Sequence, residues 1–183
     1  MGEVLVQNYI ANGIVTFGEY HRYWSDRTRG EKNPQFDEVS SQILDLKEGK
    51  MSAVRYFFGV LDPVLPRDVS ICVVPSSRVA RTHPGIIQLA RQLCSKGCGR
   101  IDRTGYLVRT IDVPKLTENR RRGRDIHLAS ITVDPGMSVY GERVLLLDDV
   151  TTTGNSLYAC REILISAGAK SVEMFAIGQA VYD

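Results

Sequence analysis

VLLLDDVTTTGNSL, residues 144–157, begins with four aliphatic residues and two adjacent carboxylates, followed by one more aliphatic residue, three threonines and a glycine. The aliphatic run 144–147 has the composition of a buried central strand. Apolar residues then recur at helical spacing, and Gly168 suits a helix C-terminus. These helical positions are Leu157, Cys160, Ile163, Leu164 and Ala167. A strand and a helix therefore follow one another, with a polar cluster where the first gives way to the second.

The rest of the chain alternates between the two kinds of pattern. Short apolar runs rich in β-branched residues predict strands at 68–75, 106–108, 131–133 and 172–178. Helical periodicity occupies 37–61, which Gly49 divides, and resumes at Pro84. This alternation predicts an α/β fold with a mainly parallel, twisted sheet and helices on both faces.

The length of the chain bounds the number of domains. With 183 residues, 43% of them hydrophobic and 24% charged, the chain can bury one substantial core. We therefore expect a single domain over 1–183. Within it, residues 1–36 indicate an irregular strand region and residues 37–183 the core.

Neither the charge balance nor the hydropathy of the chain favours nucleic acid or a membrane as a partner. Lys plus Arg exceed Asp plus Glu by only two, so the charge balance does not indicate nucleic acid, and any basic function must be local. Apolar runs stay well short of the ~18 residues of a membrane span. The opening MGEVLVQNYI lacks the basic and apolar regions of a signal peptide. We expect a cytoplasmic protein without a membrane partner.

The polar cluster has the composition of a sugar-phosphate site. Ligands of open parallel sheets bind beyond the carboxyl ends of the strands, and backbone N–H groups at a helix start hold phosphate. Gly154 would let the backbone approach such a phosphate closely. Asp148 and Asp149 would repel a bare phosphate, so a vicinal diol or a magnesium ion of the same ligand suits them better. The alternative is that the carboxylates cap the helix and the threonines form a turn.

The whole stretch resembles the ribose-phosphate binding motif of type I phosphoribosyltransferases, in which aliphatic residues, two acids, an aliphatic residue and a threonine-rich loop follow in this order. The resemblance implies that family's fold, with 1–36 as a small N-terminal hood. It also implies that Asp148 and Asp149 bind the ribose hydroxyls of phosphoribosyl pyrophosphate, while the loop holds its 5′-phosphate. The loop residues are Thr151, Thr152, Thr153, Gly154, Asn155 and Ser156.

A second stretch, VVPSSRVARTHPG at 73–85, resembles the pyrophosphate-binding loop of the same family. The resemblance implies contacts from Ser76, Ser77 and Arg78. Taken alone, a Pro-Ser-Ser sequence after a strand indicates an ordinary turn.

The basic stretch 109–124 resembles the family's mobile catalytic loop. It would supply Arg120 and Arg121 as catalytic residues that close over the leaving group. A run of like charges is otherwise a solvated surface.

The resemblance implies transfer of the 5-phosphoribosyl group from phosphoribosyl pyrophosphate to a small nitrogenous acceptor, with Asp148 and Asp149 also counted as catalytic. It implies Mg²⁺, chelated by the pyrophosphate and ribose oxygens and contacting the two carboxylates indirectly or through water. Purine transferases of this family carry an acid at the position of Thr152, and threonine cannot replace it at neutral pH. A 6-oxopurine is therefore less expected than an orotate-like or other acceptor, unless Asp125 or His127 supplies the acid.

Within the family the chain is most similar to ComF-like and orotate-type domains. ILDLKEGKMSAVRYFFGVL, residues 43–61, resembles the first helical region of the ComF-like proteins, with Lys47 as its basic residue. The cysteine cluster often found at their N-terminus is missing, so a competence role does not follow. A regulator that senses phosphoribosyl pyrophosphate and binds RNA or DNA, and an interaction module with a decayed site, remain as competing hypotheses. A homodimer is compatible with the sequence.

Overall fold

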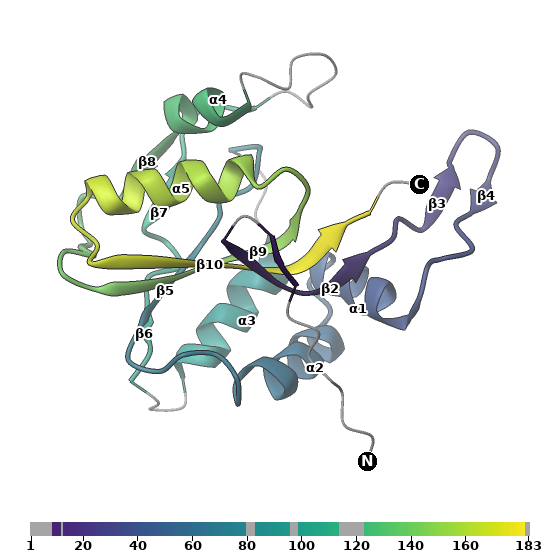
Figure 1. Cartoon of the computed structure of the whole chain (residues 1–183), viewed down its shortest axis with the longest axis horizontal. Helices are drawn as coiled ribbons and strands as arrows, with labels where there is room; N and C mark the ends of the chain where they lie inside the picture. Colours follow the sequence, from purple (N-terminus) through teal and green to yellow (C-terminus); the bar gives the residue numbers. More distant parts are fainter. Residues whose placement is uncertain (1–8, 12, 80–82, 96–98, 114–122, 182–183) are drawn as a thin grey trace.

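A computed structural model describes residues 9–11, 13–79, 83–95, 99–113 and 123–181 (Figure 1). Strands and helices alternate along most of the chain. The elements are β1 (Tyr9–Ala11), β2 (Ile14–Tyr20), β3 (Trp24–Asp26), β4 (Glu31–Lys32), α1 (Glu38–Lys47), α2 (Met51–Leu61), β5 (Ser70–Val73), α3 (Pro84–Cys94), β6 (Ile101–Asp102), β7 (Leu107–Arg109), α4 (Gly123–Ser130), β8 (Ile131–Val133), β9 (Arg143–Thr151), α5 (Asn155–Ser166) and β10 (Ser171–Ala180).

A mainly parallel sheet forms the centre of the molecule. Across the described residues its strands lie in the order β1-β2-β10-β9-β5-β6. Neighbours from β2 to β6 are parallel, and β1 pairs antiparallel with β2 at the edge. The fold class expected from the alternation of patterns is confirmed.

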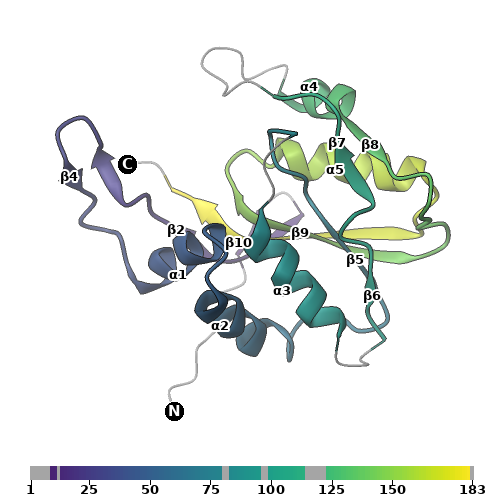
Figure 2. The ribbon, with the colours of Figure 1, turned by 180° about the vertical axis from the view of Figure 1, so that it is seen from behind.

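Helices cover both faces of this sheet (Figures 1 and 2). Leu145 and Leu147 of β9 pack in one core cluster with α1, α2 and α3. Val144 and Leu146 point to the other face, where they pack with α5. The period-2 alternation of a strand therefore divides four consecutive aliphatic residues between two cores.

Local signals explain where the first helices begin and end. The Asp37 carboxylate caps α1 by accepting a hydrogen bond of 2.7 Å from the Ser40 backbone N–H. Gly49, with φ +78°, turns the chain between α1 and α2. Pro84 occupies the first turn of α3, where its missing N–H costs nothing.

Three expectations about elements need correction. β9 does not end at Leu147 but runs on to Thr151, because β10 stays paired beside it, with Asp148 opposite Ala176 and Thr151 opposite Gln179. The strands predicted at 106–108 and 131–133 are β7 and β8, which pair antiparallel with each other outside the parallel sheet. The end of the stretch taken as a loop is helix α4.

The N-terminal region contributes to two parts of the molecule. β2 lies inside the central sheet, parallel to β10. β3 and β4 form a hairpin that projects from the body (Figure 1). At its base the Tyr23 ring meets Trp24 and Phe36 edge to face, with centroids 4.8 and 5.1 Å away.

Within the described ranges, the helices are all too short or too polar to cross a membrane.

Candidate functional site

The two loops singled out in the sequence begin side by side at one edge of the sheet. Val73 of β5 lies opposite Leu147 of β9 in the parallel register. The next backbone N–H, that of Val74, donates to the Leu147 carbonyl at 2.9 Å. β5 therefore ends beside Leu147, and the turn that follows it begins next to the part of β9 that carries Asp148 and Asp149.

The hydroxyl-rich turn leads directly into helix α5. Thr151 is the last, buried residue of β9, whereas Thr152 and Thr153 are exposed. Gly154 caps α5 with φ +77°, and as a glycine it offers no side chain to the first N–H groups of the helix. These N–H groups and the hydroxyl of Ser156 are thus available to an anion at the helix start.

Asp149 lies on the face of the sheet covered by α1 and α3, next to two basic groups. Its Oδ2 is 3.5 Å from Nδ1 of His83, and its Oδ1 is 3.9 Å from Nζ of Lys47. The ammonium of Lys47 also lies 5.1 Å from the centre of the Tyr20 ring. The pKa of Tyr20 is raised by burial and by the Asp149 charge. Tyr20, Lys47 and His83 thus surround this carboxylate.

Asp148 faces the opposite way and is buried, and among the described residues it forms no ion pair. Its Oδ1 accepts a hydrogen bond of 2.9 Å from the Asp149 backbone N–H. Burial, and then the charge of Asp149, raise the pKa of Asp148 well above its usual value. In turn, burial and then the Asp148 charge raise the pKa of the Cys160 thiol of α5. The two carboxylates therefore have unlike surroundings.

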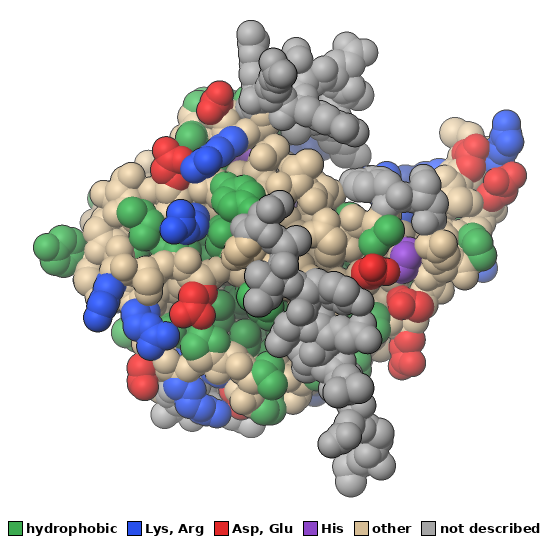
Figure 3. Space-filling model, in the orientation of Figure 1, with side chains coloured by type: hydrophobic (Ala, Val, Ile, Leu, Met, Phe, Trp, Pro, Cys, Tyr) green, Lys and Arg blue, Asp and Glu red, His purple; other side chains and the backbone are tan. Residues whose placement is uncertain are grey.

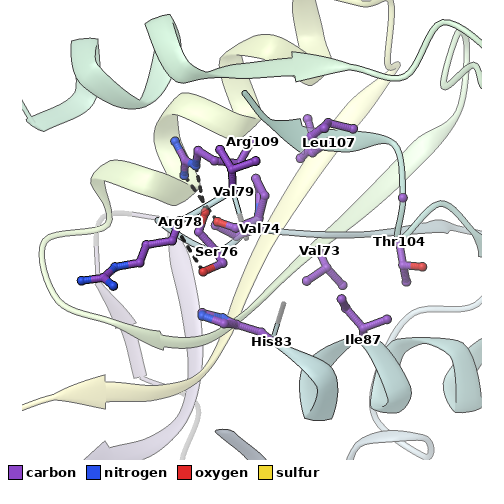
Figure 4. A pocket seen from close by; sticks show the side chains of 13 residues that line it. Val73, Val74, Ser76, Arg78, Val79, His83, Ile87, Thr104, Leu107 and Arg109 are labelled. Atoms are coloured by element: carbon purple, nitrogen blue, oxygen red, sulfur yellow. Dashed lines mark hydrogen bonds between the residues drawn. The ribbon is translucent and has the colours of Figure 1, made fainter. Parts of the chain in front are cut away.

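The turn after β5 holds the residues predicted to bind pyrophosphate. Ser76 is buried, and its hydroxyl accepts from the Arg78 backbone N–H at 3.3 Å. Ser77 and Arg78 are exposed. Ser76 and Arg78 line a cavity of about 220 Å³ together with His83, and Figure 4 shows the Arg78 side chain extending away from Thr104 on the far side.

The last residue of β7 and the segment that follows it hold this turn in place through hydrogen bonds. The Arg109 guanidinium donates to the carbonyls of Ser76 and Pro75 at 2.9 and 3.4 Å. The Val113 N–H donates to the Ser77 carbonyl at 2.8 Å, and the Asp112 carboxylate accepts from the Val79 N–H at 2.6 Å. Arg109, counted in the sequence as the start of a mobile loop, is a buried structural contact.

The catalytic arginines predicted in the basic stretch, Arg120 and Arg121, lie outside the described residues. Of the two candidates for a missing acid, Asp125 is exposed on α4, whereas His127 is buried. His127 lies against Ser156, with Nε2 3.4 Å from the serine Oγ. Burial, and then Arg109, lower its pKa.

Sequence reasoning missed the surroundings of Asp149. His83 precedes the first residue of α3, and Lys47 was noted only as the basic residue of a resemblance. The order of parallel strands offered a signal for His83, since it stands where the chain leaves the β5 edge and enters α3. Nothing local indicated that the last residue of α1 would reach β9.

Among known proteins, the chain has a distant relative whose name refers to ribose phosphate. No protein-family model matches the chain. A curated ribose-phosphate pyrophosphokinase from Saccharolobus solfataricus is 27% identical over 124 residues, covering 64% of this chain. The aligned part is 42% of that relative, so the chain matches less than half of its length.

Solved structures that are similar to the chain include two purine phosphoribosyltransferases. A hypoxanthine phosphoribosyltransferase from Staphylococcus aureus has a TM-score of 0.40 and 14% identity, covering 79% of this chain and 75% of that one. Adenine phosphoribosyltransferase from Leishmania tarentolae has a TM-score of 0.49 and 14% identity over 94% of both chains. The resemblance to ComF-like and orotate-type proteins is not confirmed and stays a prediction.

Proposed function

We propose that this protein transfers the 5-phosphoribosyl group from phosphoribosyl pyrophosphate to a small nitrogenous acceptor, releasing pyrophosphate. The observation that carries the proposal is the carboxyl-terminal side of the neighbouring strands β5 and β9. A carboxylate pair, a hydroxyl-rich turn on a helix start and a second serine-containing turn meet there. The curated relative, by its name, also acts on a ribose phosphate.

The turn from Thr151 to Ser156 suits the 5′-phosphate. Helix-start N–H groups and neutral hydroxyls bind an anion without a competing fixed charge. The ribose hydroxyls can then donate to the carboxylates at the end of β9, since an ionised carboxylate only accepts. In this arrangement Asp149 orients the sugar, Lys47 balances its charge, and His83 lies against its other oxygen.

The pyrophosphate would lie along the second turn. Ser77 and Arg78 are exposed there, and the backbone is held by the hydrogen bonds from β7. Cleavage of the bond at ribose C1 develops positive charge on the sugar and negative charge on the leaving group. Arg78 can offset the negative charge on the leaving group. The basic stretch with Arg120 and Arg121 is proposed to close over that group.

Mg²⁺ fits the residues at this edge as an ion shared with the substrate. Among the described residues, no group of three or more His, Cys, Asp and Glu side chains could hold a metal by itself. One or two carboxylates plus substrate phosphates and water are the usual surroundings of Mg²⁺, so Asp148 and Asp149 would hold it indirectly. When bound, it would neutralise charge developing on pyrophosphate.

Titration calorimetry with phosphoribosyl pyrophosphate, with and without Mg²⁺, tests the proposal, followed by pyrophosphate release with a panel of nucleobases. Asp149→Asn removes one carboxylate of the edge. Glu173→Gln is the matched control, because this exposed glutamate lies near the amino end of β10, at the opposite edge of the sheet. We expect the first variant to lose transfer and the second to keep it.

Other outcomes would identify the competing functions. Salt-dependent RNA or DNA binding with ligand binding but no transfer would indicate the regulator. The visible face in Figure 3 gives that reading no support, since basic and acidic side chains are interspersed on it. Failure to bind phosphoribosyl pyrophosphate under any condition would refute the proposal and favour an interaction module.

A further inference from the structure

A buried chain of hydrogen bonds joins the two ligand-facing turns. It begins at the Ser76 carbonyl of the turn after β5, which accepts from Arg109 Nε at 2.9 Å. It continues from an Arg109 terminal nitrogen to His127 Nδ1 at 3.3 Å, and from His127 Nε2 to Ser156 Oγ at 3.4 Å. Four elements that are distant in sequence thus contribute to one connection.

Arg109 is fixed from several sides within this chain. It is 5% exposed and donates to the Ser76 and Pro75 carbonyls and to the Ser130 hydroxyl, the last at 2.5 Å. A guanidinium has donors only and does not lose its charge in proteins. The nitrogen of His127 that faces it must therefore accept.

This contact determines where the proton of His127 lies. If Nδ1 accepts from Arg109, the neutral ring carries its hydrogen on Nε2, and Nε2 donates to Ser156 Oγ. Burial and the adjacent guanidinium both lower the His127 pKa, which favours the neutral ring at neutral pH. The Ser156 oxygen then receives a hydrogen bond, and its own O–H must point elsewhere.

Helix α4 is held against α5, so the contact is not incidental. Arg124 pairs with Glu162, and its guanidinium lies 6.0 Å from the centre of the Tyr158 ring. A Cβ at Gly123 would lie 2.5 Å from Asn155 Nδ2, so the start of α4 closely approaches the first residue of α5. His127 therefore meets the first turn of α5 in a packed interface.

We propose that Arg109 and His127 are positioning residues that present the Ser156 hydroxyl as a hydrogen-bond donor to the phosphate of a phosphorylated ribose. The inference rests on the proposed function for its ligand. Ser156 stands in the first turn of α5, beside the N–H groups that face the same anion. Without the histidine, the hydroxyl is free to turn toward other acceptors.

Two amide variants of His127 separate this role from a structural one. In His127→Gln the side-chain nitrogen reaches the position of Nε2 and can still donate to Ser156. In His127→Asn the side chain reaches only the position of Nδ1, so it can accept from Arg109 but not donate to Ser156. Both are neutral and both lose part of the network, so stability alone does not distinguish them.

Binding of ribose 5-phosphate, measured by calorimetry, is the readout. We expect Ser156→Ala to weaken binding about tenfold, as for one hydrogen bond to a charged group. His127→Asn should weaken it roughly fivefold, and His127→Gln should stay within about twofold of the unsubstituted protein. Because both act through one contact, His127→Asn combined with Ser156→Ala should bind like Ser156→Ala alone.

The proton position can be measured independently by nitrogen NMR of the histidine rings, of which the chain has three. A hydrogen on Nδ1 of His127 would overturn the inference, even if a variant failed to fold. Additive losses in the double variant, or equal binding by both amide variants, would also overturn it.

The failure of the inference and the failure of the proposed function are distinguishable. Ribose 5-phosphate binding without transfer from phosphoribosyl pyrophosphate would refute the transferase and leave the positioning role standing. Transfer that survives His127→Asn with unchanged affinity would refute the positioning role alone. If the protein binds neither compound, both fall.

Discussion

Replacing Gly154 by alanine tests the geometry of the turn that begins α5. The residue has φ +77°, a conformation that costs an L-residue about 1–2 kcal/mol. An added Cβ would also lie 2.6 Å from Ile14 Cδ1 and 2.9 Å from a carbon of the Tyr158 ring. Ile14 is buried, so it can retreat only by disturbing the core, and overpacking of this kind costs about 1–3 kcal/mol.

The matched control is Gly141→Ala, because the two glycines differ in surroundings but not in backbone. Gly141 has φ +72°, and a Cβ there would meet nothing within 4 Å. We expect this variant to lose only the conformational part, about 1–2 kcal/mol. Gly154→Ala should lose about 2–5 kcal/mol in total.

Urea unfolding followed by circular dichroism measures both free energies. In a chain of this size 1 kcal/mol corresponds to about 2–4 °C in melting temperature, so thermal unfolding gives a second reading. Losses that agree within about 0.5 kcal/mol would refute the reasoning, since the close approach of Ile14 and Tyr158 would then have no energetic consequence.

Two further predictions concern buried charges. Arg100 is 5% exposed and donates to the Asp62 carboxylate and to the carbonyls of Leu65 and Pro66. Arg100→Lys should therefore lower the free energy of unfolding, measured by urea titration, by about 3 kcal/mol. A loss below about 1 kcal/mol would contradict this. Asp148 has a raised pKa in the folded state, so the native protein loses stability as pH rises above the unfolded value of about 3.9. Asp148→Asn should therefore be more stable than the native protein at pH 7 and lose this advantage near pH 4. A difference in free energy of unfolding that does not change with pH would show that the carboxyl is ionised without penalty.

Much of the fold could be predicted from local sequence. Asp37 as a cap, Gly49 as a break and Pro84 as a start are properties of short segments, and the helices form where they indicate. The meeting of the two turns also followed from sequence, because the carboxyl ends of parallel strands share an edge. The ribbon of β7 and β8 did not follow, since an apolar run does not specify which strand it will pair with.

The contacts that refine the site depend on tertiary structure. Arg109 has the appearance of a solvated charge in a basic stretch, yet its donors find the Pro75, Ser76 and Ser130 oxygens and the His127 ring. No local pattern marks an arginine whose partners lie 18 or more residues away. Such residues are recognised only when the fold supplies the acceptors.

The two adjacent aspartates look equivalent in the sequence but have different surroundings in the fold. In sequence they form a pair, but as successive residues of β9 they point to opposite faces of the sheet. Asp149 meets the basic groups at α1 and α3, and Asp148 faces the side of α5. Both residues precede the end of β9, and β5 pairs with β9 only as far as Leu147, so a ligand that contacts both must approach beside the strand where β5 has ended. The turn beginning at Thr152 follows the same strand, so one sugar phosphate can meet the carboxylates and the helix start only if its ribose lies along this side of β9.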